Sequence, residues 1–143
     1  MIRIAVAALA VAGLGACSTG LSSGGNLPSD QLTVQSDYRA VFQAATAQAE
    51  RCLRGNGDAY AVQGTVDDAT RTAQVRVVAP FTNDDVARVN IVGQGAKQTQ
   101  VDIVMWGRGI WNEKAVQAMH AAVIYQVPSC TSYMPVGPLK EQG

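Results

Sequence analysis

The side chains of this sequence that could perform acid–base or metal chemistry are few and widely spaced. His120 is the single histidine among 143 residues, and no Cys, Asp or Glu lies three or four positions from it. A recognisable metal site needs several ligands at short spacing. We therefore expect His120 to be a surface or boundary residue, and the sequence predicts no metal site and no cofactor.

Two pairs of adjacent aspartates, Asp67-Asp68 and Asp84-Asp85, carry the type of side chain that general acids and calcium sites use. Each pair lies between two strand-like runs. Aspartate is favoured at such corners because its side chain accepts hydrogen bonds from the turn backbone, and an exposed carboxylate there has no reason to act as an acid. We expect turn roles for both pairs, with calcium binding or catalysis as the alternative.

Both tryptophans of the chain fall within residues 106–111, on either side of an arginine that lies between two glycines. Tryptophan and arginine are enriched at binding hot spots, so Trp106, Arg108 and Trp111 are the candidate binding residues, for a sugar or a protein. Trp106 is opposite in strand parity to Met105, and we expect it to face solvent. The alternative is structural: Trp106 covers the outer face of a sheet and Trp111 packs at the start of a helix.

The amino-terminal segment has the pattern of an export signal. Met1-Ile2-Arg3 supplies a positive start, and the next thirteen residues, IAVAALAVAGLGA, are all apolar or small. In a helix they would rise about 20 Å, less than the roughly 30 Å of a bilayer's hydrocarbon core, but they fit the apolar region of a secretory signal. The stretch ends in Leu14-Gly15-Ala16-Cys17, which resembles the lipobox of bacterial lipoproteins.

That resemblance implies that the Cys17 thiol is alkylated by diacylglycerol and that a signal peptidase removes residues 1–16. Ser18 after the cysteine, in place of aspartate, implies export to the outer membrane of a two-membrane host, with the domain facing the periplasm. Residues 17–35 are expected to be the lipidated cysteine and a flexible tether, since Ser18 to Gln35 begins with a linker composition. The alternatives are an ordinary secretory signal that carries a cysteine, or a buried helix.

Two cysteines remain if Cys17 carries lipid, and an even pair in an exported protein favours a disulfide. Cys52 and Cys130 would close a loop of about 78 residues, which stabilises the fold by roughly 4–4.5 kcal/mol in the chain-entropy model. The alternatives are two free thiols or a cysteine nucleophile. No second cysteine lies at a CxxC spacing, and His120 has no evident orienting carboxylate.

Periodicity predicts one helix, four strands and a second helix. The first helix spans Ser36 to Leu53, with Ser36 as its N-cap and Cys52 on its buried face. The strands alternate over Tyr60–Val66, Thr72–Ala79, Ala87–Ile91 and Thr99–Trp106, and the second helix runs from Asn112 to about Tyr125.

These elements predict an α+β two-layer sandwich over residues 36–130, a four-stranded antiparallel meander with two helices on one face and one disulfide, followed by an irregular tail over 131–143. The order helix–four strands–helix is similar to that of helix-grip domains in some outer-membrane assembly lipoproteins. This likeness concerns topology alone, and a fold does not transfer a function.

Eleven basic residues balance eleven acidic ones, so no basic field predicts nucleic-acid binding. The sequence favours a non-catalytic binding or assembly module, attached to the membrane by its amino-terminal lipid, whose partner is an envelope protein or a glycan. One alternative is a periplasmic hydrolase acting on cell-wall material, with Asp102 and Arg108 as its participants. Another is a structural or surface-exposed lipoprotein.

Overall fold

A computed structural model of the chain describes residues 20–23 and 25–131. The expected signal over 1–16, Cys17 and the tail beyond Thr131 lie outside the described residues. The elements in chain order are η1 (Gly20–Ser23), β1 (Ser29–Val34), α1 (Tyr38–Cys52), η2 (Asn56–Asp58), β2 (Ala61–Asp67), β3 (Thr72–Val78), β4 (Asp85–Gly95), β5 (Gln98–Met105) and α2 (Glu113–Tyr125).

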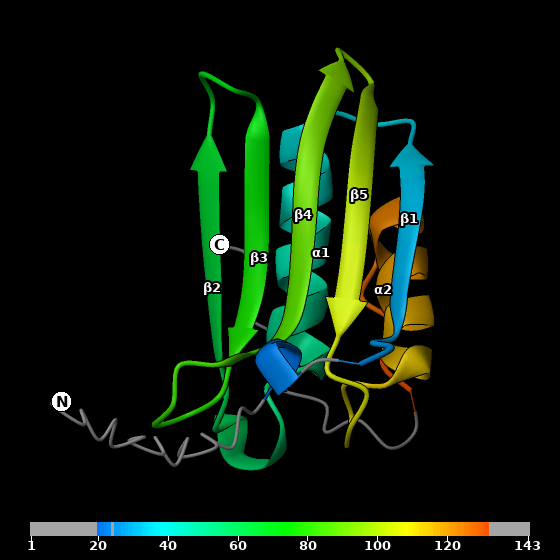
Figure 1. Cartoon of the computed structure of the whole chain (residues 1–143). Helices are drawn as coiled ribbons and strands as arrows, with labels where there is room; N and C mark the ends of the chain where they lie inside the picture. Colours follow the sequence, from blue (N-terminus) through cyan, green and yellow to red (C-terminus); the bar gives the residue numbers. More distant parts are fainter. Residues whose placement is uncertain (1–19, 24, 132–143) are drawn as a thin grey trace, which may run out of the picture.

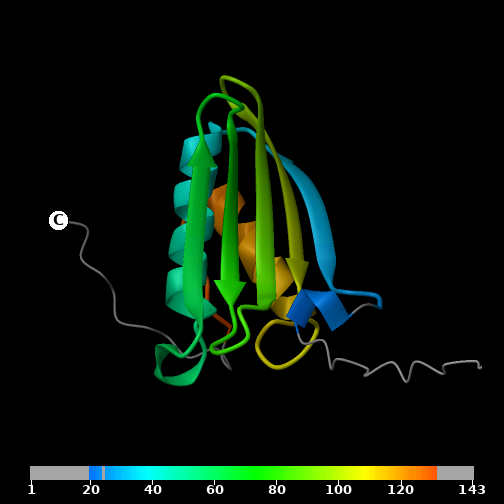
Figure 2. The ribbon, with the colours of Figure 1, turned by 60° about the vertical axis from the view of Figure 1, so that its left-hand side comes forward.

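The fold is α+β, with two helices packed on one face of an antiparallel sheet (Figure 1). Strands follow the order β1-β5-β4-β3-β2, so β2 to β5 form the expected meander and β1 returns to pair with β5. Figure 2 shows the same two layers after a turn of 60°. The two-layer architecture predicted from the sequence is confirmed.

The number of strands was underestimated, because the sheet has five strands instead of four. The fifth is β1, which lies in the segment expected to be part of the tether. It is a short polar edge strand in which only Leu32 and Val34 are apolar. Both of these side chains face the helices, and Leu32 pairs with Val101 of β5. Two apolar residues among Ser, Asp, Gln and Thr resemble a linker composition, so this strand becomes visible only when β5 is placed beside it.

The N-cap of helix α1 lies one residue later than expected. Asp37, and not Ser36, is the N-cap, and its carboxylate accepts a hydrogen bond from the backbone N–H of Arg39. Ser36 instead links elements, because its carbonyl accepts from Thr99 Oγ1 at 2.8 Å and its hydroxyl accepts from Gln126 Nε2 at 2.8 Å. The expected apolar stripe is present: Tyr38, Val41, Ala45, Ala49 and Cys52 are all buried.

Helix α2 begins where the sequence predicted. Asn112 is its N-cap, and the side-chain oxygen accepts from the backbone N–H groups of Lys114 and Ala115. The helix ends at Tyr125, after which Gln126 adopts a left-handed backbone conformation. The core is the layer between the helices and the inward-facing residues of the sheet, chiefly Val75, Val77, Val89, Ile91, Val101, Ile103, Met105 and Met119.

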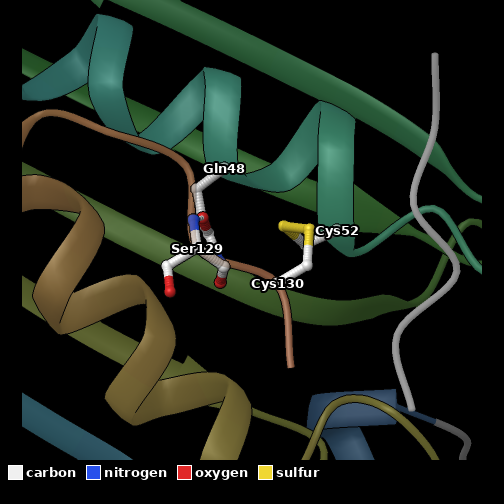
Figure 3. Close-up of a disulfide and its surroundings, with 4 residues drawn as sticks. All are labelled: Gln48, Cys52, Ser129 and Cys130. Atoms are coloured by element: carbon white, nitrogen blue, oxygen red, sulfur yellow. Dashed lines mark hydrogen bonds between the residues drawn. A yellow bond between two sulfur atoms is a disulfide. The ribbon is translucent and has the colours of Figure 1, made fainter. Parts of the chain in front are cut away.

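The expected disulfide joins Cys52, at the end of α1, to Cys130, beyond α2 (Figure 3). A second tie lies one turn earlier on α1. Gln48 is fully buried, and its amide donates to the Ser129 carbonyl at 2.8 Å and accepts from the Ser129 N–H at 2.7 Å. The segment after α2 is therefore held along α1 by one covalent bond and two hydrogen bonds.

Replacing both cysteines (Cys52→Ser/Cys130→Ser) is expected to lower the free energy of unfolding by roughly 4.5 kcal/mol, since the 78-residue separation sets the entropy of the open chain. Chemical denaturation in a Cys17→Ser background measures the change. The control is the same background treated with reductant, which should lose a similar amount. A loss below about 1 kcal/mol in both samples would contradict this account of the disulfide.

Candidate functional site

One face of the sheet is covered by the helices, and the other carries the candidate site. We call it the open face. Its side chains come from alternate positions of the five strands, and most are amides, hydroxyls or charged groups, with Val92 of β4 and Val104 of β5 as apolar members. The polar members are Ser29, Gln31 and Thr33 of β1, Gln63, Thr65 and Asp67 of β2, Thr72, Gln74 and Arg76 of β3, Arg88 and Asn90 of β4, and Gln100 and Asp102 of β5.

Strand pairing brings the amide groups of this face together at its centre. Gln74 and Asn90 are direct cross-strand partners, and Gln74 Nε2 donates to Asn90 Oδ1 at 2.7 Å. On one side of Asn90 a shallow hollow of about 400 Å³ extends over β3 and β2, and on the other a shallow hollow of about 510 Å³ extends over β5 and β1. Asn90 lines both hollows. The site is thus a broad, shallow surface of mostly polar side chains, with Val92 in the lining of one hollow and Val104 in that of the other.

A charge cluster lies at the end of the open face where β4 begins. Arg76 and Arg88 are direct cross-strand partners, an arrangement that repels unless a counter-charge lies between them. Asp85 supplies it: Oδ1 accepts from Arg76 Nε at 2.8 Å and Oδ2 accepts from Arg88 Nε at 2.9 Å. The pairing shifts between Val77 and Val78, so β4 carries an extra residue there. This bulge places Asp85 on the same face as Arg88, three positions away.

The turn role expected for Asp85 is therefore wrong. Its side chain is only 5% exposed, and it belongs to a strand and to an ion cluster. Burial alone would raise the pKa of Asp85, but the hydrogen bonds from Arg76 and Arg88 outweigh it and hold the pKa below its ordinary value. Asp85 is a fixed negative charge and not a proton donor.

The other aspartate pair shows one turn residue and one ion-pair residue. Asp67 accepts from the backbone N–H groups of Ala69 and Thr70, which confirms its turn role. Asp68 accepts a hydrogen bond from the Tyr38 hydroxyl and pairs with Arg39, both of α1. The bond from Tyr38, more than the one from Arg39, lowers the pKa of Asp68. Asp68 thus connects the β2–β3 turn to the start of α1.

The three candidate binding residues of segment 106–111 are brought together by a tight turn. Trp111 N–H donates to the Arg108 carbonyl at 3.1 Å, and Gly107 N–H donates to the Trp111 carbonyl at 2.7 Å. The Arg108 guanidinium lies 5.7 Å from the centre of the Trp106 ring, within the range of a cation–π contact. Gly109 has a φ of +58° in this turn, a conformation that glycine adopts without strain.

Trp111 is a structural residue. It is 6% exposed, and its indole N–H donates to the Leu53 carbonyl at 3.0 Å, so it ties the end of α1 to the start of α2. Its ring lies 4.2 Å from that of Tyr60 and 6.3 Å from that of Trp106. The structural alternative for Trp111 therefore accounts for all these contacts.

Trp106 does not face solvent as strand parity indicated. Because β5 ends at Met105, the next residue no longer follows the alternation, and Trp106 packs half-buried against the core. Its indole Nε1 is buried and makes no hydrogen bond within the described residues. Arg108 is the exposed member of the three. Binding by this segment stays a prediction, and Arg108 is the side chain through which it would act.

His120 and Asp102 lie at different places on the fold. His120 Nδ1 lies 2.5 Å from Asp30 Oδ2 of β1, so this half-exposed histidine links α2 to the edge strand. Sequence spacing could not show this pair, because the residues are 90 positions apart. Asp102 lies on the open face between Gln31 and Asn90, and its Oδ1 is buried without a hydrogen-bond partner among the described residues.

The chain was compared with known protein families and with curated proteins. A scan against models of protein families and a search of curated proteins both found no match. Within residues 20–23 and 25–131, no group of three His, Cys, Asp or Glu side chains is placed to hold a metal ion. Over the same ranges, neither helix has the length and apolar character needed to cross a bilayer.

The acids and tryptophans could be singled out from the sequence, but the open face as a surface could not. The signal was present in the strand patterns, where Gln, Asn, Thr and Arg occupy the positions opposite to the core residues. Such residues are ordinary on a solvated face. Only the strand order shows that they are contiguous and that no segment within residues 20–23 and 25–131 covers their centre.

Replacing Asp85 by asparagine is expected to lower the free energy of unfolding by about 1–2 kcal/mol at neutral pH, because the half-exposed Arg76 and Arg88 then repel each other across the strand pair. The loss should itself depend on pH. Since the folded pKa of Asp85 lies below its unfolded value of about 4, the carboxylate stabilises the fold fully above pH 4 and progressively less as the pH falls.

Chemical denaturation of the wild-type and Asp85→Asn chains from pH 7 to pH 3 measures this dependence. The two stabilities should converge at low pH. Glu113→Gln, which removes one exposed acid from the first turn of α2, serves as the control and should keep the wild-type profile. A constant difference between wild type and Asp85→Asn across this pH range would contradict the assignment.

Proposed function

We propose that this protein is a non-catalytic binding module of the bacterial envelope, anchored to the membrane by diacylglycerol on Cys17. Two features support the anchor. Residues 4–16 are wholly apolar or small and end in Leu-Gly-Ala before Cys17. The domain also contains a disulfide, which is typical of proteins that fold in an oxidising compartment outside the cytosol.

The binding role is supported by the centre of the open face, which no part of the chain that the structure describes covers. Amide side chains both donate and accept hydrogen bonds, and here they line two adjoining shallow hollows that meet at Asn90. Such a surface matches an extended ligand rich in hydroxyl and acetamido groups. We therefore propose a glycan of the cell wall as the ligand.

Anchoring would make a weak contact effective. A lipid confines the domain to a thin layer beside the membrane, which raises its local concentration toward any polymer that lies within reach. Ser18 favours the outer membrane with the domain in the periplasm. A shallow site with modest affinity suffices under these conditions, because the anchor supplies much of the encounter probability.

Mass spectrometry of the chain purified from membranes is expected to find a diacylglycerol thioether on Cys17 as the new first residue. Cys17→Ser should move the protein from the membrane to the soluble envelope fraction, since a single covalent anchor is lost. Ser18→Asp is the matched control for location: it should keep the lipid and move the chain to the inner membrane. An unmodified Cys17 thiol in the natural product would overturn the anchor.

Binding to isolated peptidoglycan sacculi tests the open face. The double variant Gln74→Ala/Asn90→Ala is expected to bind about tenfold more weakly, because two hydrogen-bonding amides at about 0.5–1.5 kcal/mol each are lost. Gln43→Ala/Gln117→Ala is the matched control, since it removes two exposed amides from α1 and α2. Equal binding by both double variants and wild type would contradict the glycan site.

A hydrolase is the second candidate, and one observation favours it. Asp102 lines the 510 Å³ hollow and has a buried oxygen without a hydrogen-bond partner among the described residues. A hydrolase would release soluble fragments from the same sacculi, and Asp102→Asn would abolish the release while leaving binding in place. Binding without release supports the non-catalytic proposal.

A further inference from the structure

The attachment of the amino-terminal segment to the sheet determines how far the domain can stand from a membrane. Only Ser18 and Thr19 separate Cys17 from Gly20 in the sequence. Gly20 begins η1, which lies against β4 on the side of the sheet away from the helices (Figures 1 and 2). The segment expected to be a flexible tether of about eighteen residues thus already contacts the domain at its third residue, Gly20.

Gly20 lies so close to β4 that no other residue fits without a shift. A Cβ atom at this position would lie 2.3 Å from the carbonyl oxygen of Asp85, and the backbone φ is +67°. Both observations require glycine. They place η1 at the end of the sheet where β4 begins and β5 ends, which we call the η1 end (Figure 1).

The distance from the lipid follows from chain geometry. Three residues span at most about 11 Å from Cys17 to Gly20 when fully extended. The headgroup layer on each side of a bilayer is about 5–7 Å thick, taking the hydrocarbon core from the total thickness. If Cys17 is acylated, the η1 end lies at or next to the headgroups.

An exposed phenylalanine lies at this same end. Phe81 belongs to the loop between β3 and β4, whose residue Asp84 would come within 3.3 Å of a Cβ on Gly20. Its exposed fraction is 104%, the highest among the large apolar side chains of the described residues. Its φ is +71°, a conformation rare for a bulky residue. Exposure of the Phe81 ring and strain in its backbone both cost free energy in water. Contact of the ring with lipid would offset the cost of its exposure.

A cation lies at the same end of the sheet. Trp106 N–H donates to the Val86 carbonyl at 2.9 Å, so segment 106–111 adjoins the start of β4 and presents the exposed Arg108 at the η1 end. The negative charge of Asp85 at this end is already neutralised by Arg76 and Arg88. An exposed aromatic ring and a guanidinium at one end of a domain suit the boundary between acyl chains and phosphates.

We propose that the η1 end is a membrane-contacting surface, with Phe81 inserted between the lipid headgroups and Arg108 paired with their phosphates. This inference rests on the proposed acylation of Cys17. The strands then run away from the bilayer, and the open face points sideways into the periplasm, at the height of a polymer that lies above the membrane.

The opposite end of the molecule provides the control position. Tyr125, the last residue of α2, is 75% exposed, and the following Gln126 contacts Ser36, whose carbonyl accepts from Thr99 at the β4–β5 hairpin. That hairpin is the far end of the sheet from η1 (Figure 1). Phe81→Trp and Tyr125→Trp thus each exchange one exposed aromatic residue for tryptophan, at opposite ends.

The test uses the full lipidated chain reconstituted in vesicles of phosphatidylethanolamine and phosphatidylglycerol with brominated acyl chains. Bromine quenches tryptophan fluorescence at short range. Relative to wild type, which supplies the signal of Trp106 and Trp111, Phe81→Trp should add fluorescence that is quenched more than twofold in brominated against unbrominated vesicles. Tyr125→Trp should add fluorescence that is not quenched.

The outcomes separate this inference from the anchor on which it rests. Absence of the lipid from Cys17 by mass spectrometry would overturn the proposed function and this inference with it. A lipidated chain that floats with the vesicles, but in which both added tryptophans stay unquenched or are quenched equally, would overturn only the orientation. A blue-shifted Phe81→Trp emission without quenching would assign the η1 end to a protein contact and overturn the membrane contact.

Discussion

Burial of a single face of the sheet by α1 and α2 is the constraint on which the rest of the structure depends. The apolar side chains of β3, β4 and β5 alternate toward the helices, and those of the helices form matching stripes. Every intervening side chain is thereby directed to the other side. The candidate site is a consequence of this arrangement, because a sheet covered on one face must present a polar surface on the other.

Asp85 connects the arginine pair of the open face, the bulge in β4 and the packing of Gly20, which are far apart or invisible in the sequence. Its carboxylate neutralises two arginines that strand pairing places opposite each other, and the bulge in β4 is what directs it to that face. Its backbone carbonyl borders Gly20, so the amino-terminal segment packs at the same point. Charge compensation on the open face and the position of the proposed anchor are therefore set by one corner of the sheet.

The aromatic residues of segment 106–111 show how a hot-spot composition can serve the fold. Trp111 donates its indole N–H to the Leu53 carbonyl, and its ring packs against that of Tyr60. It therefore joins the two helices and the start of β2. Trp106 packs beside it, and of the three candidate binding residues Arg108 is the exposed one. The side chain that we propose to contact lipid at this end is instead Phe81. In the sequence it is only one phenylalanine in a loop, so its composition gives no sign of this role.

Local sequence determined the elements whose signal is local. Strand alternation, the cap at Asn112, the turn role of Asp67 and the α+β class could all be predicted, because each depends on residues a few positions apart. The even pair of cysteines also predicted the disulfide. Tertiary structure alone decided what depends on distant partners. Edge strand β1 is defined by β5, His120 meets Asp30 across 90 positions, and Asp85 reaches its arginines through a bulge. The physical reason is that hydrogen bonds and ion pairs of this kind form between residues that are adjacent in space. The number of residues between them in the sequence does not indicate that they are neighbours.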